Sequence, residues 1–321
     1  MNKQILIWKL IVESLEKNIP VMLLYVLESS GSSPGREGFF MAVNINGQME
    51  GSVGGGIMEY KFVEMAKTRL QDDNDEVSVH KQIHDKAAAK NQSGMICSGQ
   101  QTIVLYKLQQ KDSIPISNII SSLQKNKNGT LHLSPHGISF KNNPPVKNFG
   151  LDLKDDNDWT YIEKTGYKNY LYIIGGGHCA LALSKMMSMM DFYITVFDER
   201  KELNTIEKNE YAHEKKIIKD YGELSQFIPS GRNNYVVIMT FGYRTDDIAI
   251  RALLNKDFKY FGILGSKTKI KKMFTDYRKE NIGENVLKKI HAPIGMQIKS
   301  ETPEEIAISI AAEIIRIKNG I

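Results

Sequence analysis

The spacing of hydrophobic residues predicts a helix, a strand and a hairpin at the start of the chain. Apolar residues recur every three or four positions near 4–17, which is typical of an amphipathic helix. A continuous apolar run at 21–27 predicts a buried strand. Two shorter runs, 39–43 and 49–53, flank the dipeptide Asn46-Gly47, which favours the tight turn of a β-hairpin.

The pattern becomes weaker toward the middle of the chain. It predicts a helix near 57–70 and a strand over 101–106. Residues 107–165 are rich in Lys, Asn and Asp, and we expect there only a short helix near 117–124, a hairpin around 135–137 and then a linker. We interpret this stretch as a solvated excursion from the first domain.

Strand and helix patterns alternate regularly from residue 170 onward. The predicted strands cover 170–174, 192–197, 235–240 and 260–264, and the predicted helices cover 177–190, 246–254, 267–277 and about 303–318. Such alternation favours parallel pairing with right-handed crossovers. We therefore predict an α/β protein, in which an N-terminal mixed α+β domain over 1–165 precedes a Rossmann-like, doubly wound parallel-sheet domain over 166–321.

Composition narrows the class of protein. With 41% hydrophobic and 25% charged residues, the chain is neither collagen-like nor disordered. The formal net charge of +5 is spread along the chain and gives no reason to expect nucleic acid binding. The two cysteines, Cys97 and Cys179, are too few for a disulfide scaffold and favour a reducing compartment. We see neither a signal peptide nor an apolar run long enough for a membrane span, so we expect a cytoplasmic protein.

A glycine-rich turn follows the predicted strand at 170–174. The sequence Gly175-Gly176-Gly177-His178-Cys179-Ala180 is a G-x-G-x-x-A motif between a strand and a helix. There Gly175 permits the tight turn, and Gly177 lets a pyrophosphate approach the backbone amides at the helix start. Asp198 lies 21 positions after Gly177 and ends the next strand, where a carboxylate accepts a ribose 2′-hydroxyl. A Rossmann-like domain that binds another nucleotide-like ligand, or none, remains an alternative.

Further motifs lie at predicted strand ends and helix starts in both domains. In the first domain they are Gly31-Ser32-Ser33-Pro34, Gly51-Ser52-Val53-Gly54-Gly55-Gly56 with Glu59, and Cys97-Ser98-Gly99. In the second they are the glycine turn, 240–246, 262–267, Pro293-Ile294-Gly295 and Thr302-Pro303-Glu304-Glu305. In this order and spacing, they resemble the xanthine dehydrogenase accessory factor family, also called the XdhC/CoxI family. Taken alone, the last motif is interpreted as a helix start with a capping box.

The resemblance implies an accessory protein without turnover of its own. Such a chaperone binds a molybdopterin-type cofactor as cargo, holds it during sulfuration and inserts it into a molybdenum hydroxylase. The implied partners are that client enzyme and a cysteine desulfurase, and the implied assembly is a homodimer. The alternative is an NAD(P)-dependent oxidoreductase that uses the Rossmann half. We see no recognisable acid or base for hydride transfer, which argues against it. We expect the binding site in the crevice between the two domains.

The predicted cofactor-binding residues combine these loops. They are Cys97, Ser32, Ser33, Arg36, Gly54, Gly55, Gly175, Gly176, Gly177, Asp198, Thr240, Gly265 and Ser266. The thiol of Cys97 is also a candidate molybdenum contact, since soft thiolates suit that metal, and a small buried hydrophobe is its alternative. Arg36 could equally be a solvated loop residue, and Ser266 could equally be a helix N-cap before Lys267.

Four positions depart from the family pattern, namely Ile57, Phe241, Tyr243 and Gln297. The first three stand where the family commonly has cysteine or histidine, and the fourth stands where an aspartate is usual, so no metal or acid–base role is assigned to them. His80 and His84 have a metal-like spacing, but a zinc site needs further ligands, so we interpret them as surface residues. We predict no structural zinc and no catalytic residue.

Overall fold

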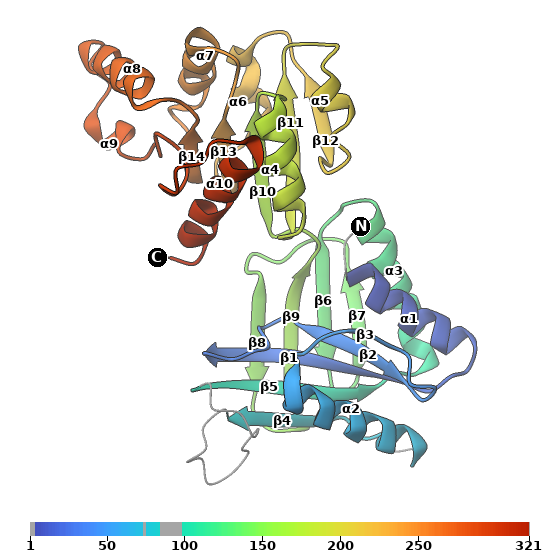
Figure 1. The fold of residues 1–321 in the computed structure, drawn as a ribbon. Coiled ribbons are helices and arrows are strands. Elements are labelled where there is room, and N and C mark those ends of the chain that lie inside the picture. Colours follow the sequence, from blue (N-terminus) through green and yellow to red (C-terminus); the bar gives the residue numbers. More distant parts are fainter. Residues whose placement is uncertain (1–3, 73–74, 84–97, 321) are drawn as a thin grey trace. The chain divides into compact units, whose positions relative to one another are not determined.

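The chain forms two compact units. A computed structural model describes residues 4–72, 75–83 and 98–320 (Figure 1). Contacts divide the chain into a first unit, Met1–Gly166, and a second unit, Tyr167–Ile321. The sequence-based boundary after residue 165 lies one residue earlier. No helix within the described residues is both long and apolar enough to cross a membrane.

An antiparallel sheet forms the centre of the first unit, with the strand order β3-β2-β1-β5-β4. Its strands are β1 (Val21–Gly31), β2 (Phe40–Asn44), β3 (Met49–Gly51), β4 (Ser78–Ile83) and β5 (Gly99–Lys107). The predicted hairpin is confirmed, because β2 and β3 pair antiparallel and Gly47 takes the positive φ of 81° in the turn between them. The long central strand β1 pairs with both β2 and β5.

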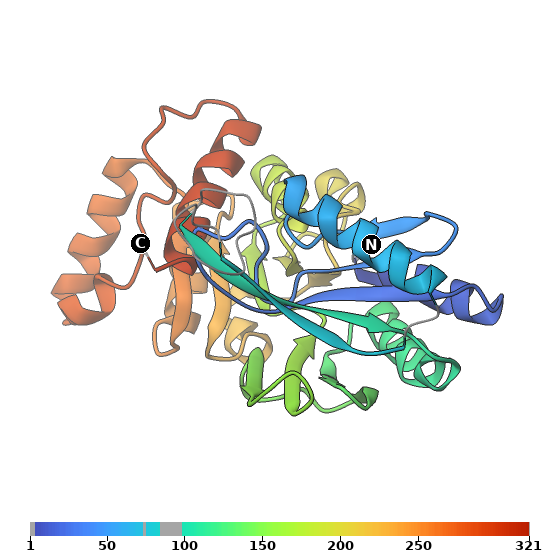
Figure 2. The ribbon, with the colours of Figure 1, turned by 90° about the horizontal axis from the view of Figure 1, so that it is seen from below.

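Both faces of this sheet are covered. On one face, Met22 and Leu24 of β1 pack against Met58 and Phe62 of α2 (Gly56–Gln71). On the other face, Leu23 and the remaining alternate residues of β1 pack against α1 (Gln4–Glu16) and α3 (Ser113–Gln124). Figure 2 shows α2 on one side of the sheet and α3 on the other. Alternation along β1 thus places neighbouring side chains in two separate cores.

The stretch 107–165 is not a solvated excursion, so that interpretation is wrong. Beyond a 3₁₀ turn (Gln110–Asp112) and α3, it contains a second antiparallel sheet of order β7-β6-β9-β8, whose strands are β6 (Gly129–Ser134), β7 (Gly137–Lys141), β8 (Phe149–Leu153) and β9 (Trp159–Thr165). Along β9, Trp159, Tyr161, Glu163 and Thr165 are buried, and Trp159 and Tyr161 join the core of the first sheet. Polar residues in the loops and on the outer faces of these strands conceal the pattern in the sequence.

The second unit confirms the predicted parallel sheet. Its strand order is β12-β11-β10-β13-β14, and all pairs are parallel. The strands are β10 (Asn169–Ile174), β11 (Phe192–Asp198), β12 (Glu214–Ile217), β13 (Gly231–Ile238) and β14 (Phe258–Ile263). The sequence did not predict β12, because this edge strand reads Glu-Lys-Lys-Ile and is too short and charged to show a periodic pattern. The predicted α/β fold class is confirmed.

Helices cover both faces of the parallel sheet. Side chains of α4 (His178–Ser188) and α10 (Pro303–Lys318) pack on one face, and those of α6 (Leu224–Phe227), α7 (Tyr243–Leu253) and α8 (Lys267–Lys279) pack on the other. The remaining elements are α5 (Asn204–Glu207), α9 (Glu284–Leu287) and a 3₁₀ turn (Tyr221–Glu223). The strand order reverses at β10, and ligands of such sheets bind outside the carboxyl ends of the strands at this point.

Candidate functional site

Three glycine- and serine-rich segments meet at one end of the first sheet. A Cβ atom on Gly35 would lie 2.1 Å from the carbonyl oxygen of Val53, and one on Gly54 would lie 2.5 Å from the amide nitrogen of Gly35. A Cβ on Gly99 would lie 2.6 Å from the carbonyl carbon of Ser32. Backbones approach this closely only where the side chain is absent. The structure therefore brings together the 31–36, 51–56 and 98–99 segments that carry the family resemblance.

Gln101 joins two of these segments, and sequence reasoning missed it. Its Oε1 accepts hydrogen bonds from the Ser33 hydroxyl (2.6 Å) and the Gly35 amide (3.1 Å), while its Nε2 donates to the Val53 carbonyl (3.2 Å). The residue is buried in β5, so each bond satisfies a polar group that water cannot reach. The signal in the sequence is one glutamine at the start of an otherwise apolar strand.

The second glycine segment already holds an internal anion. Oε2 of Glu59 accepts hydrogen bonds from the amides of Val53 (2.8 Å) and Gly55 (2.9 Å) and from the Ser52 hydroxyl (2.6 Å). The amide of Gly54 donates to the Ser52 hydroxyl at 3.1 Å. An anionic ligand could reach the Gly55 amide, which the sequence assigns to the cofactor, only by displacing this carboxylate.

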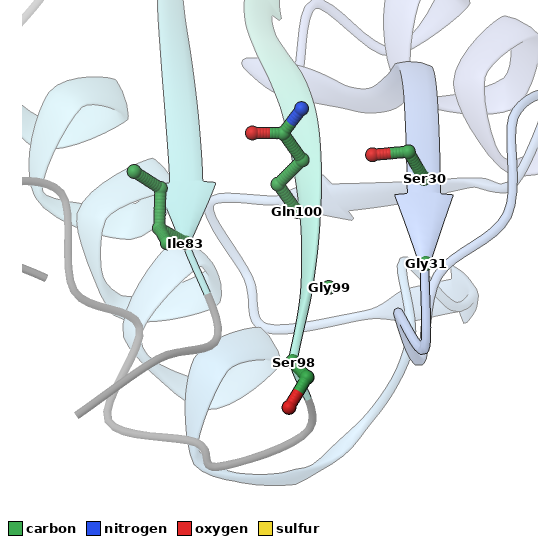
Figure 3. A pocket seen from close by; sticks show the side chains of 6 residues that line it. All are labelled: Ser30, Gly31, Ile83, Ser98, Gly99 and Gln100. Atoms are coloured by element: carbon green, nitrogen blue, oxygen red, sulfur yellow. The ribbon is translucent and has the colours of Figure 1, made fainter. Parts of the chain in front are cut away.

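A cavity of about 280 Å³ opens beside these segments, at the ends of β1 and β4 and the start of β5 (Figure 3). It is lined by Ser30, Gly31, Ile83, Ser98, Gly99 and Gln100. Its wall is small and polar, with Ile83 as the apolar side chain. Arg36 is exposed and donates a hydrogen bond from Nη1 to the carbonyl of Gly31, one of these lining residues (2.9 Å). Ser32 is exposed, and Cys97 and His84 lie outside the described residues.

The glycine turn of the second unit joins β10 to α4. Gly175 has φ 103°, and a Cβ on it would lie 2.4 Å from the carbonyl oxygen of Met239. A Cβ on Gly176 would meet Ile206 at 2.2 Å, whereas one on Gly177 would meet no atom within 4 Å. Gly175 and Gly176 thus pack the turn against the protein. Beside Gly177, at the N-terminus of α4, the space is open, as an approaching phosphate requires.

Asp198 lies at the end of β11 but faces inward. Its carboxylate accepts hydrogen bonds from the Gly176 amide (2.7 Å) and from Arg200 through its amide (2.9 Å), Nε (2.8 Å) and Nη2 (2.7 Å). Burial alone would raise the pKa of Asp198, but the hydrogen bonds from Arg200 and Gly176 outweigh it and hold the pKa below its usual value. The predicted contact to a ribose hydroxyl would require one of these bonds to be given up.

A second ion pair lies at the same edge of the sheet, where β13 and β14 end. Buried Asp246 pairs with Lys269 and accepts a hydrogen bond from the Thr240 hydroxyl (2.5 Å). Ser266 caps α8 by accepting from the Lys269 amide (3.2 Å), so its N-cap interpretation is confirmed, and Gly265 directly precedes it. Sequence reasoning singled out Lys267, but the structure uses Lys269, which lies near one helical turn beyond the cap.

Three other predicted features have local structural roles. Thr302 and Glu305 form the expected capping box at the start of α10, with Pro303 in its first turn. Cys179 is half-buried and packs beside the core, as expected, and burial raises the pKa of its thiol. His80 is half-buried in β4 rather than a plain surface residue, and it contacts the Ser78 hydroxyl at 2.9 Å. Within the described ranges, no group of three or more His, Cys, Asp or Glu could hold a metal ion.

Comparisons with known proteins identify both units. A family model described as the XdhC Rossmann domain matches residues 171–314, and one described as the XdhC and CoxI family matches residues 14–80. The chain is 23% identical over 305 residues to YqeB of Escherichia coli K12, a protein described as uncharacterized, covering 95% of this chain and 45% of that one. It is 27% identical over 180 residues to a protein of Bacillus subtilis 168 described as a probable xanthine dehydrogenase subunit, covering 55% and 51%. The chain therefore spans about half the length of these curated relatives.

A solved structure has the same fold along the chain. It is described as a xanthine dehydrogenase from Bacillus halodurans, and it superposes with a TM-score of 0.69 at 23% sequence identity. The match covers 97% of this chain and 96% of that one. Both units therefore have counterparts in one known protein.

Proposed function

Since this chain belongs to the XdhC and CoxI family, we propose that it binds a molybdenum cofactor and inserts it into a xanthine dehydrogenase-type hydroxylase. Family membership supports the coarser statement, an accessory or maturation role for such an enzyme. The relative from Bacillus subtilis, which is described as a probable component of xanthine dehydrogenase, supports this choice of client. The proposal includes a cysteine desulfurase as the sulfur donor, a homodimeric assembly and a cytoplasmic location.

The convergence of three family motifs on one cavity carries the proposal. The cargo has a phosphate, a dithiolene and a polar pterin, so it needs hydrogen-bond donors and little apolar surface. The cavity in the first unit provides such a wall, with Ser30, Ser98 and Gln100 among its lining residues. Exposed Arg36 adds a cation beside it, bonded to the lining residue Gly31. Cys97 directly precedes Ser98 in the chain and is the proposed soft ligand for the molybdenum end.

We also propose that the second unit binds a nucleotide at its glycine turn. Its support is the open space beside Gly177 at the N-terminus of α4, together with the packed Gly175 and Gly176. The nucleotide could be part of the cargo or a separate NAD(P) molecule. The second alternative would be accompanied by hydride transfer if the protein were an oxidoreductase.

A titration with both ligand classes tests the proposal. The full-length chain is incubated with molybdopterin, NADH or NADPH, and retention of each ligand is measured after gel filtration. Loaded protein is then mixed with cofactor-free hydroxylase, and the recovered activity is followed. We expect molybdopterin to be retained and to activate the client without turnover of NADH or NADPH. Turnover of a nicotinamide nucleotide, with no retention of molybdopterin, would replace the proposal by the oxidoreductase alternative.

A further inference from the structure

We infer that the second unit selects a nucleotide with a phosphate on its adenosine ribose, which Arg200 binds and Phe241 supports. The inference rests on the proposed nucleotide site at the glycine turn and names the class of ligand there. Arg200 follows β11 and Phe241 follows β13, the two strands that flank β10 in the sheet. Both residues therefore lie at the carboxyl edge where the glycine turn ends β10.

The acidic side chains that would select an unphosphorylated ribose are engaged. In Rossmann domains that bind NAD, a carboxylate at the end of the second strand accepts the ribose 2′-hydroxyl. Here Asp198 is fully buried, and its oxygens are held by Gly176 and Arg200. The next residue, Glu199, accepts a hydrogen bond from the backbone amide of Tyr221 at 2.9 Å. Neither carboxylate is presented as a free acceptor.

Arg200 keeps part of its guanidinium available. Nε and Nη2 are bound to Asp198, which fixes the side chain, and no group within the described residues accepts from Nη1. The side chain is 39% exposed. Arginine N–H groups bind phosphate through charge-assisted hydrogen bonds, and little rotamer freedom remains to be lost in a fixed side chain. An arginine at this place in a Rossmann fold is the residue that accommodates a ribose 2′-phosphate.

Phe241 gives the same place a flat apolar surface. The guanidinium carbon of Arg200 lies 5.1 Å from the centre of the Phe241 ring, in a cation–π contact. The ring is 66% exposed, which is unusual for an aromatic side chain with no ligand. An exposed ring beside a fixed guanidinium suits a purine that carries an anionic group. The pair thus matches an adenosine phosphate better than an uncharged ribose.

Calorimetric titration of the full-length chain tests this selection. The probes are adenosine 2′,5′-bisphosphate, adenosine 3′,5′-bisphosphate and adenosine 5′-monophosphate, followed by NADPH and NADH. We expect the 2′,5′-bisphosphate to bind roughly tenfold more tightly than the monophosphate, with NADPH preferred over NADH to a similar degree. Equal affinities for the monophosphate and the 2′,5′-bisphosphate would overturn the inference. Equal affinities for the two bisphosphates would overturn the assignment to the 2′ position.

Two variants and one control separate the roles. Arg200→Gln should remove the preference for the 2′-phosphate and leave the affinity for the monophosphate within about twofold. Because this change leaves Asp198 without its cation, Phe241→Ala provides a second test that does not touch the ion pair. It should weaken all the adenosine ligands several-fold. Arg232→Gln, which removes a cation at the opposite end of β13, should change none of these affinities.

Failure here is distinguishable from failure of the proposed function. If molybdopterin is retained and transferred but the adenosine phosphates do not bind, the cargo role stands and the inference about Arg200 is wrong. If the phosphate preference is found but molybdopterin is not retained, the inference stands and the cargo role is wrong.

Discussion

Gln101 and Ser33 lie 68 positions apart in the chain, yet their side chains share a buried hydrogen bond of 2.6 Å. The same amide also binds the backbone of Gly35 and Val53, so a single side chain connects two loops that carry the family motifs. The position of the loops beside the cavity therefore depends on a residue outside those motifs.

Gln101→Leu should destabilise the first unit. The substitution leaves the Ser33 hydroxyl and the Gly35 amide buried without this partner, which costs about 1–3 kcal/mol per unsatisfied group. Urea denaturation should show a lower free energy of unfolding. The matched control is Gln82→Leu, which changes its cross-strand neighbour on β4, where the side chain bonds only the carbonyl of the preceding Lys81. Equal stability of both variants would show that Gln101 does not hold the loops.

Gly177→Val should abolish nucleotide binding with little effect on folding. A side chain on Gly177 would enter open space and meet no protein atom, but it would block the approach of a phosphate to the amides of α4. We expect an unchanged melting temperature and a loss of affinity of roughly tenfold or more. Gly150→Val on β8 is the control, since its Cβ also meets nothing within 4 Å. Nucleotide binding as tight as in the wild type would make the turn purely structural.

Cys97→Ser should weaken molybdopterin retention while leaving folding normal. The change keeps a small side chain and replaces a soft sulfur by a hydroxyl. Metal analysis after gel filtration and activation of the client hydroxylase are the measurements. Cys179→Ser is the comparison, because burial raises the pKa of the Cys179 thiol and lowers its thiolate fraction at neutral pH. Cys179 should therefore react slowly with Ellman's reagent. Equal cofactor retention by Cys97→Ser and the wild type would exclude the thiol as a ligand.

Glu59→Ala should make the first unit responsive to phosphate. Removing this carboxylate frees the amides of Val53 and Gly55, which leaves two donors unsatisfied and lowers stability by about 1–3 kcal/mol. Free phosphate should then raise the melting temperature of the variant more than that of the wild type, because it can replace the lost acceptor. Equal phosphate effects on the two proteins would mean that these amides do not form an anion site.

Acid should destabilise the second unit through His213. Burial lowers the pKa of His213, and its Nδ1 accepts a hydrogen bond from the Ile194 amide (3.0 Å), which a protonated ring cannot do. The unfolded chain therefore binds a proton more readily than the folded one, so stability contributed by the neutral ring is lost as the pH falls below about 6.5. His213→Phe should flatten the pH dependence of unfolding between about pH 7 and 5, whereas His136→Phe, at an exposed site, should not. An unchanged slope in His213→Phe would contradict this.

Local patterns in the sequence predicted the second unit well. Each strand there pairs in parallel inside a buried sheet, so its residues form continuous apolar runs that are visible without knowing the partner. Helix starts such as Thr302 and Ser266 were predictable for the same reason, because a capping residue and its amide partner are three positions apart. The glycine turn also lies within one strand–helix junction.

Tertiary structure decided what depends on distant partners. The second sheet at 129–165 exists because β9 buries alternate residues against β1, and its polar positions conceal that in the sequence. Asp198 was identified at the right place, but whether its carboxylate faces a ligand or Arg200 depends on packing around the Gly176 amide. Lys269 and Gln101 acquire their roles only once strands far apart in the chain are neighbours. Hydrogen bonds and ion pairs across a fold leave no periodic trace, because their spacing in sequence is set by the topology rather than by any local repeat.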